Sequence, residues 1–138
     1  MTDMTLQSED RDLLAHAEAA AQFTYSPYSK FPVGAALLTS DDSVIRGCNV
    51  ENISYGLTNC AERSALFAAI SQGLAPRSFK AMAVYAPNVA LISPCGACRQ
   101  VLLELMAPDA RVICAGSDPA AAKVWTLEQL LPGAFDAF

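Results

Sequence analysis

Positive charge is scarce in this chain. Nine lysines and arginines stand against fourteen aspartates and glutamates, so the formal net charge is −5. The basic residues are scattered, and no run of them forms. A protein surface that follows a phosphate backbone needs clustered lysine and arginine side chains. We therefore expect no nucleic acid polymer among the partners of this protein.

Long apolar runs are also missing. No stretch reaches the roughly 18–20 apolar residues that span a bilayer, and residues 1–11 are polar and acidic, unlike a secretory signal. We expect a cytoplasmic protein with no membrane partner. Hydrophobic residues make up 53% of the 138 residues and charged residues only 17%, the opposite of a disordered chain. The length predicts one domain over residues 1–138, since domains cluster near ~100–150 residues.

Histidine is nearly absent, whereas cysteine is not. His16 is the only histidine, and it falls in the middle of an alanine-rich segment where a partly exposed side chain is expected. The cysteines number five, which is odd, and Cys95 and Cys98 have C-x-x-C spacing. In a chain without a secretory signal, this pattern favours metal or redox chemistry over disulfides.

Hydrophobic periodicity predicts helices that alternate with strands. The predicted helices cover residues 8–23, 60–72, 95–106 and 127–131, and the predicted strands cover 33–39, 43–50, 79–86, 111–115 and 123–125. Ser8, Asn59 and Thr126 are placed to cap three of the helices. This order predicts an α/β fold with a mixed five-stranded sheet covered by helices on both faces.

Three cysteines lie at predicted helix starts. Cys60 precedes one helix, and Cys95 and Cys98 open another. Free amides and the dipole at a helix N-terminus lower the pKa of a thiol, which favours thiolate ligands for a metal. Zinc takes four ligands in a tetrahedron, and a catalytic site leaves one position to water. The pattern predicts a catalytic zinc site with three sulfur ligands.

One carboxylate stands inside this pattern. Glu62 falls in the first turn of a largely apolar helix, where an unpaired buried carboxylate is costly. A water bound beside it on zinc supplies the partner, and Glu62 then acts as general acid and base. Arg63 and Arg99 follow metal ligands closely in sequence and could donate to the sulfurs, which would offset their excess negative charge.

Other interpretations of the cysteines compete with the catalytic site. Cys48 or Cys114 could supply a fourth ligand and close the site as a structural one. A redox C-x-x-C pair would leave Cys60 and Glu62 unexplained. Buried cysteines also pack as small hydrophobic residues, which is the best interpretation of Cys48 and Cys114.

The motifs resemble a known family. Cys60-Ala61-Glu62, followed by Pro94-Cys95-Gly96-Ala97-Cys98-Arg99-Gln100, resembles the zinc-dependent cytidine deaminases of the short, homotetrameric, three-cysteine type. The resemblance implies a three-layer α/β/α fold, a homotetramer, and one zinc ion per subunit held by Cys60, Cys95 and Cys98. It also implies hydrolytic deamination of cytidine and 2′-deoxycytidine to uridine and 2′-deoxyuridine with release of ammonia, in pyrimidine salvage.

The same resemblance implies roles at the base. Zinc-bound hydroxide attacks C4, while Glu62 shuttles the proton from the zinc water to N3 and then to the departing amine. Phe31 packs on the base. The backbone of Ala61 and the carbonyl of Ser93 read the base edge and the amino group.

Further roles concern the sugar and the subunit contacts. Asn49 and Glu51 resemble the pair that holds the ribose 3′-hydroxyl, although on the residues alone they could also be a strand end and a solvated loop. Tyr55 and Phe135 resemble residues that contact a neighbouring subunit's site. The aromatic loop over residues 25–32 could form a pocket wall or fill the core.

Three functional alternatives stay open from the sequence. The enzyme could deaminate another aminated heterocycle, such as a nucleoside antibiotic. A zinc-stapled binding module would bind without turnover. A polynucleotide editor would show salt-sensitive binding to single strands.

Overall fold

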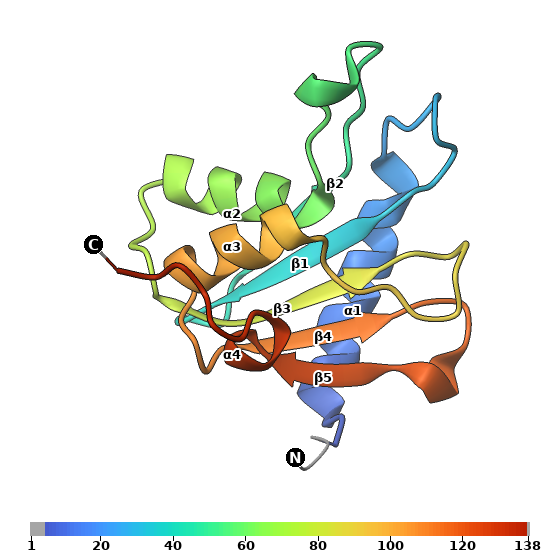
Figure 1. Cartoon of the computed structure of the whole chain (residues 1–138). Helices are drawn as coiled ribbons and strands as arrows, with labels where there is room; N and C mark the ends of the chain where they lie inside the picture. The colour runs from blue at the N-terminus through green and yellow to red at the C-terminus, as the bar shows by residue number, and fades with distance from the viewer. Residues whose placement is uncertain (1–4, 138) are drawn as a thin grey trace.

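The computed structural model describes residues 5–137, and residues 1–4 and 138, the two ends of the predicted domain, lie outside it. A five-stranded sheet forms its centre (Figure 1). The strands are β1 (Gly34–Thr39), β2 (Val44–Cys48), β3 (Phe79–Tyr85), β4 (Arg111–Ala115) and β5 (Lys123–Thr126). The α-helices are α1 (Ser8–Ala20), α2 (Ala61–Ser71), α3 (Gly96–Leu105) and α4 (Leu127–Leu130), with single 3-10 turns at Ala21–Phe23, Tyr55–Leu57 and Pro119–Ala121.

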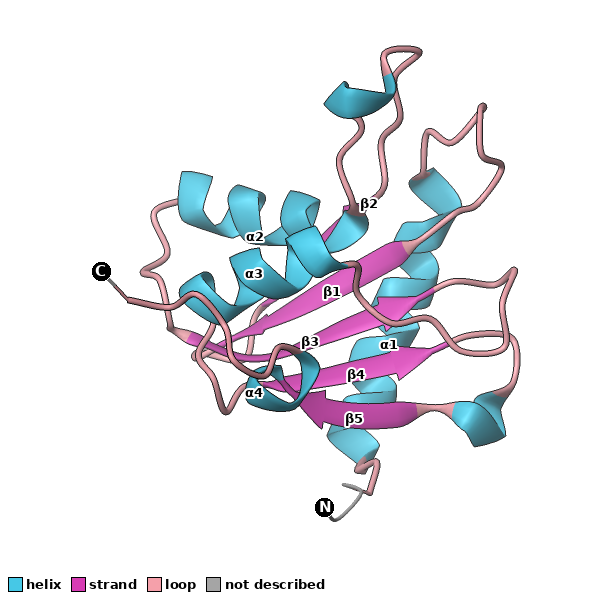
Figure 2. Cartoon of the chain, in the orientation of Figure 1, coloured by secondary structure: helices cyan, strands magenta, loops and turns pink. Residues whose placement is uncertain are grey.

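The sheet is mixed, in the order β2-β1-β3-β4-β5. β1 pairs antiparallel with β2 and β3, β3 pairs parallel with β4, and β5 returns antiparallel to β4. Helix α1 covers one face, and α2 and α3 cover the other (Figure 2). The predicted α/β fold with helices on both faces is confirmed. Within residues 5–137, every helix is too short or too polar to cross a membrane.

Side chains that alternate along the strands build two cores. Leu37, Met82 and Val112 point toward α2 and α3, where they are fully buried in the larger cluster. Ala36 and Ile113 point the other way, into a smaller cluster under α1. The larger core lies beneath the helix starts that carry the cysteines, so it fixes their position.

The helix starts differ from the prediction in an informative way. α2 and α3 each begin one residue late, because Cys60 (φ −75°, ψ 156°) and Cys95 (φ −67°, ψ 166°) are extended N-cap residues. Asn59, the predicted cap, instead donates from Nδ2 to the Ser64 hydroxyl. Both cysteines therefore stand directly before a free helix N-terminus, where the amides stabilise a thiolate.

The other two predicted caps have opposite outcomes. The cap at Ser8 is wrong, because the N-cap of α1 is Gln7, whose backbone amide donates to the Asp10 carboxylate at 2.8 Å. The cap at Thr126 is confirmed, and Thr126 forms a reciprocal capping box with Gln129.

Candidate metal and substrate site

Helices α2 and α3 begin side by side (Figure 1). Three sulfur atoms converge at these two helix starts. The Sγ atoms of Cys60, Cys95 and Cys98 all lie within 4.8 Å of one another, and those of Cys60 and Cys95 are 3.8 Å apart. Zinc–sulfur bonds of about 2.3 Å in a tetrahedron separate two sulfurs by about 3.8 Å. The donor set and its spacing therefore fit a zinc ion.

The surroundings favour thiolate at this cluster. The Arg63 guanidinium donates to the Sγ atom of Cys60 at 3.2 Å. A hydrogen bond from the Cys98 thiol, together with Arg63, lowers the pKa of Cys60 to about 5. The same bond raises the pKa of Cys98, because its proton is shared with the neighbouring thiolate. A dication that replaces this proton would leave sulfur ligands already held in place.

The remaining cysteines and the histidine stand apart from the cluster. Among the described residues, the sulfur group contains neither Cys48 nor Cys114. Cys114 is fully buried in β4, and burial raises the pKa of its thiol to about 12. His16 lies on α1, beyond the sheet, where its Nδ1 atom accepts hydrogen bonds from Arg46. The described donors thus leave a coordination position without a protein ligand.

Glu62 lies in the first turn of α2, beside the sulfurs. Its side chain is only 4% exposed. Burial raises the pKa of its carboxyl to about 7, and the charge of the Cys60 thiolate acts in the same direction. A carboxyl group with such a pKa can both accept and return a proton at neutral pH.

A cavity of about 400 Å³ opens above this carboxylate. That volume lies within the range of about 300–1,000 Å³ that is typical of small-molecule sites. Of the residues predicted to bind substrate, five line it: Phe31, Asn49, Glu51, Ala61 and Ser93. Sequence reasoning missed five other lining residues: Ser29, Val33, Thr58, Asn59 and Ile92. All five lie within three residues of a predicted site residue in the sequence. Proximity to those residues is therefore the feature from which they could have been predicted.

Asn49 connects β2 to the loop that carries Phe31. Its Oδ1 atom accepts from the Val33 amide at 2.9 Å, and its Nδ2 atom donates to the Phe31 carbonyl at 2.9 Å. These partners identify the oxygen and the nitrogen of the side-chain amide, because one atom must accept and the other must donate. One hydrogen of Nδ2 remains for a ligand in the cavity.

Glu51 reaches the same loop from the other side. Its Oε1 atom accepts from the amides of Tyr28 and Ser29 at 3.0 and 3.1 Å, and its Oε2 atom accepts from the Ser29 hydroxyl. The hydrogen bond from Ser29 is the main reason why the pKa of Glu51 is lowered. The side chain is therefore a hydrogen-bonded carboxylate at the wall of the cavity.

Arg99 was expected to donate to a sulfur, but among residues 5–137 its donors meet oxygen atoms instead. Its three hydrogen bonds run to the carbonyls of Pro94 (2.7 Å) and Leu130 (2.8 Å) and to the Ser93 hydroxyl (3.3 Å). The guanidinium thereby ties the segment before Cys95 to the end of α4. Its contribution is to hold the metal-binding loop in position.

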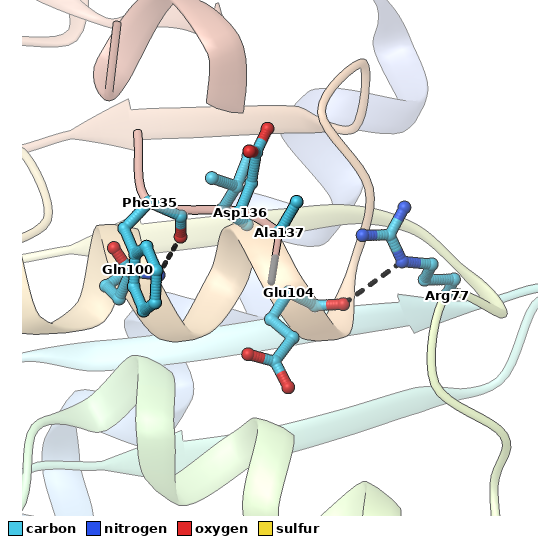
Figure 3. A pocket seen from close by; sticks show the side chains of 7 residues that line it. Arg77, Gln100, Glu104, Phe135, Asp136 and Ala137 are labelled. Carbon is cyan, nitrogen blue, oxygen red and sulfur yellow. Dashed lines mark hydrogen bonds between the residues drawn. The ribbon is translucent and has the colours of Figure 1, made fainter. Parts of the chain in front are cut away.

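Tyr55 and Phe135 lie outside the cavity. Tyr55 is 74% exposed on a projecting loop, where its ring meets that of Tyr28 edge to face. Phe135 is 64% exposed in the C-terminal tail, and its carbonyl accepts from Gln100 on α3. Figure 3 shows this tail beside Gln100 in a separate cavity of about 390 Å³. Neither aromatic side chain lines the cavity above Glu62.

A three-sulfur metal site with an open position and a buried carboxyl group, set in a three-layer α/β/α fold, defines a zinc-dependent hydrolytic enzyme. Residues 7–115 match the family described as "Cytidine and deoxycytidylate deaminase zinc-binding region". The chain belongs to this family, and zinc is its cofactor.

Individual relatives agree with that assignment. A protein named cytidine deaminase from Sporosarcina psychrophila is 48% identical, over 89% of this chain and 88% of its own. Another of that name, from Halalkalibacterium halodurans, is 51% identical over 91% and 92% of the two chains. The crystal structure of cytidine deaminase from Burkholderia pseudomallei covers 96% of this chain and all of its own, with a TM-score of 0.87 and 48% identity.

Proposed function

We propose that this protein hydrolyses the amino group at C4 of cytidine and 2′-deoxycytidine, giving uridine, 2′-deoxyuridine and ammonia. The curated relatives at about half identity carry the name cytidine deaminase. The observation that carries the proposal is Glu62, a buried carboxyl group with a pKa of about 7 beside three sulfur ligands at the base of a small cavity. Because the carboxyl group can hold or release a proton at neutral pH, it suits a reaction that moves protons twice.

Glu62 carries the protons in this reaction. Zinc, when bound, supplies the Lewis acidity that brings the pKa of a coordinated water down to about 7. Glu62 takes one proton from the attacking water and delivers it to N3 of the pyrimidine while the water oxygen bonds to C4. It then takes the second proton from the hydroxyl group now on C4 and passes it to the amino group, so that the C4–N bond breaks and ammonia leaves. Water contributes the new oxygen at C4, and the atoms balance.

The remaining cavity groups hold the base. Phe31 lies on the cavity wall, where an aromatic ring can pack on a planar pyrimidine. The backbone of Ala61 at the start of α2 and the carbonyl of Ser93 read the base edge and the amino group. Arg99 keeps Ser93 in place through its hydroxyl and the neighbouring Pro94 carbonyl.

The proposed sugar contacts use the hydrogen-bonding capacity that Asn49 and Glu51 retain beyond their contacts with the loop. One amide hydrogen of Asn49 and one acceptor site of Glu51 complement a hydroxyl group, which accepts one hydrogen bond and donates another. We assign this hydroxyl to the 3′ position of the sugar. Among the described residues that line the cavity, none is lysine or arginine and two are glutamates. A neutral nucleoside therefore suits the site better than a nucleotide phosphate.

Assembly belongs to the same proposal. We infer a homotetramer of single domains, in which Tyr55 and Phe135 contact the site of a neighbouring subunit. Their exposure, and their position outside the cavity of their own chain, support this role. None of the five cysteines forms a disulfide within the described residues, which suits a reducing cytoplasm, and conversion of cytidine to uridine assigns the enzyme to pyrimidine salvage.

The test compares Glu62→Gln with the unaltered protein on cytidine. The variant keeps the shape of the side chain but cannot exchange a proton, so we expect kcat to fall by at least about 100-fold. Zinc content should stay at one ion per chain. Glu128→Gln, at an exposed position on α4, is the matched control and should retain full activity. The rate is followed as loss of cytidine absorbance.

The alternatives have their own outcomes in this assay. A variant with a near-normal rate would remove Glu62 from the mechanism. An unaltered, zinc-loaded protein that leaves cytidine intact but deaminates another aminated heterocycle would overturn the substrate and keep the reaction class. Absence of cytidine turnover together with salt-sensitive binding of single-stranded DNA would favour a polynucleotide editor.

A further inference from the structure

The Glu51 carboxylate is held by one dipeptide. Both amides of Tyr28 and Ser29 donate to Oε1, and the Ser29 hydroxyl donates to Oε2. A carboxylate has about four acceptor sites, so these three hydrogen bonds leave about one, on Oε2. Because Glu51 lines the cavity, that acceptor site is available to a ligand there. The Ser29 hydroxyl is the only one of the three donors that fixes Oε2.

The same hydroxyl has a second partner. The Ser29 Oγ atom accepts from the Phe31 amide at 3.1 Å, so it links Glu51 to the backbone of the cavity's aromatic residue. The hydroxyl thus donates a hydrogen bond to the Glu51 carboxylate and accepts one from the Phe31 amide. Ser29 lines the cavity, but its hydroxyl is committed to these groups and acts through them.

The backbone around Ser29 is held in an unusual conformation. Lys30, between Ser29 and Phe31, has a φ of 55°, in the left-handed region that residues with side chains rarely adopt. Its amide donates to the Ser26 carbonyl at 3.0 Å, and its carbonyl accepts from Asn88 at 3.1 Å. Backbone strain of this kind is often found at functional sites, where the surrounding structure maintains it. Ser29 and Phe31, the residues on either side of Lys30, both line the cavity.

We propose that Ser29 is a positioning residue for substrate recognition: its hydroxyl aims Oε2 of Glu51 at a sugar hydroxyl and thereby sets the preference for nucleosides that carry one. The proposal rests on the proposed function, since it concerns the sugar end of the same site. No contact between Ser29 and the reacting atoms is involved.

The experiment uses two substrates that differ only at the 3′ position, 2′-deoxycytidine and 2′,3′-dideoxycytidine. Ser29→Ala should raise KM for 2′-deoxycytidine by about 10-fold, the size expected when a charge-assisted hydrogen bond is disturbed. Its kcat should change by less than about 3-fold, and kcat/KM for 2′,3′-dideoxycytidine should hardly change. Ser29→Thr retains the hydroxyl and should restore the difference between the two substrates.

Ser26→Ala is the control for general loosening of the loop, because the Ser26 hydroxyl bonds to Thr24 and not to Glu51. It should leave the ratio of the two kcat/KM values unchanged. The proposal would be overturned if Ser29→Ala lost kcat/KM equally on both substrates. It would also be overturned if Ser26→Ala changed the ratio of the two kcat/KM values as much as Ser29→Ala does. An unaltered enzyme that treats the two substrates alike would overturn the proposal as well. Failure of the proposed function is distinct, because the unaltered enzyme would then deaminate neither substrate.

Discussion

At the scale of single residues, charge decides how the metal site works. Three thiolates around a divalent cation leave one net negative charge, which weakens the pull of the metal on a bound water. Arg63 reduces that charge directly, through its hydrogen bond to the Cys60 sulfur. Arg99, by contrast, uses its donors on oxygen atoms and holds the loop. Two arginines that both lie close to a ligand in sequence therefore have different roles.

The sulfur set makes a prediction about metal content. Cys98→Ser should reduce zinc affinity by more than about 100-fold, because a thiolate ligand is lost while both other sulfurs remain. Cys114→Ser should keep one zinc per chain, since Cys114 is buried in the sheet outside the sulfur group. The serine hydroxyl placed in the core should cost roughly 1–3 kcal/mol of stability. Zinc is measured by elemental analysis after dialysis against a weak chelator.

Replacement of the two cysteines outside the sulfur group tests whether the metal site has an open coordination position. If Cys114→Ser or Cys48→Ser lost its zinc while still folded, as judged by circular dichroism, a fourth sulfur would have to be a ligand. The site would then be closed and structural, and the place of a reacting water would be gone.

How far the site could be predicted depends on how local each residue's partners are. The spacing of Cys60, Cys95 and Cys98 indicated their function because helix starts are local features. The bonds of Arg99 were not predictable in the same way, since one acceptor, the Leu130 carbonyl, lies 31 residues further along the chain. The role of Ser29 depends similarly on Glu51, 22 residues away.

At the scale of elements, the order of helices and strands was predicted correctly and the helix boundaries were less accurate. Hydrophobic periodicity depends on which face of an element is buried, and burial is strong throughout both cores. A helix start depends instead on the backbone angles of one residue. Cys60 and Cys95 are extended N-cap residues, so each helix begins one residue later than predicted, and the apolar pattern does not resolve a difference of one residue.

The contact between α1 and the sheet requires a glycine. A Cβ atom on Gly34, at the start of β1, would lie 1.9 Å from the Ala17 carbonyl oxygen and 2.6 Å from the Ala21 amide nitrogen. Both obstacles are backbone atoms at the end of α1, which cannot rotate away. Gly34 therefore permits the close approach that buries Ala17 completely.

We predict that Gly34→Ala destabilises the protein by about 3 kcal/mol, because α1 has to move away from the sheet. Ala120→Ser is the control, since it adds one side-chain atom at an exposed position in the loop after β4. The free energy of unfolding of this control variant should change by no more than about 0.5 kcal/mol. Denaturation by urea, followed by circular dichroism, measures both. Equal stability of the two variants would mean that α1 does not pack this closely on the sheet.

At the scale of the whole molecule, exposed apolar side chains point to assembly. Four of them lie on one projecting segment, visible at the top of Figure 1: Val50, Ile53, Tyr55 and Leu57. Ile53 is 78% exposed and Leu57 71%. Apolar residues gathered on one surface segment of this kind mark a protein contact. The aromatic contact between Tyr55 and Tyr28 links the segment to the loop of Ser29, so a subunit bound there would touch the wall of the cavity.

The last prediction joins assembly to activity. The unaltered protein should sediment as a tetramer, and Ile53→Asp should shift it toward smaller species, because a buried charge without a partner is costly in an interface. Activity per chain should fall with dissociation, and it should recover in part at high protein concentration, since association depends on mass action. Ala120→Asp introduces the same charge at an exposed position of another loop and should leave mass and activity unchanged. A protein that sediments as a monomer at full activity would show that each chain completes its own site, and Tyr55 and Phe135 would then need no neighbour.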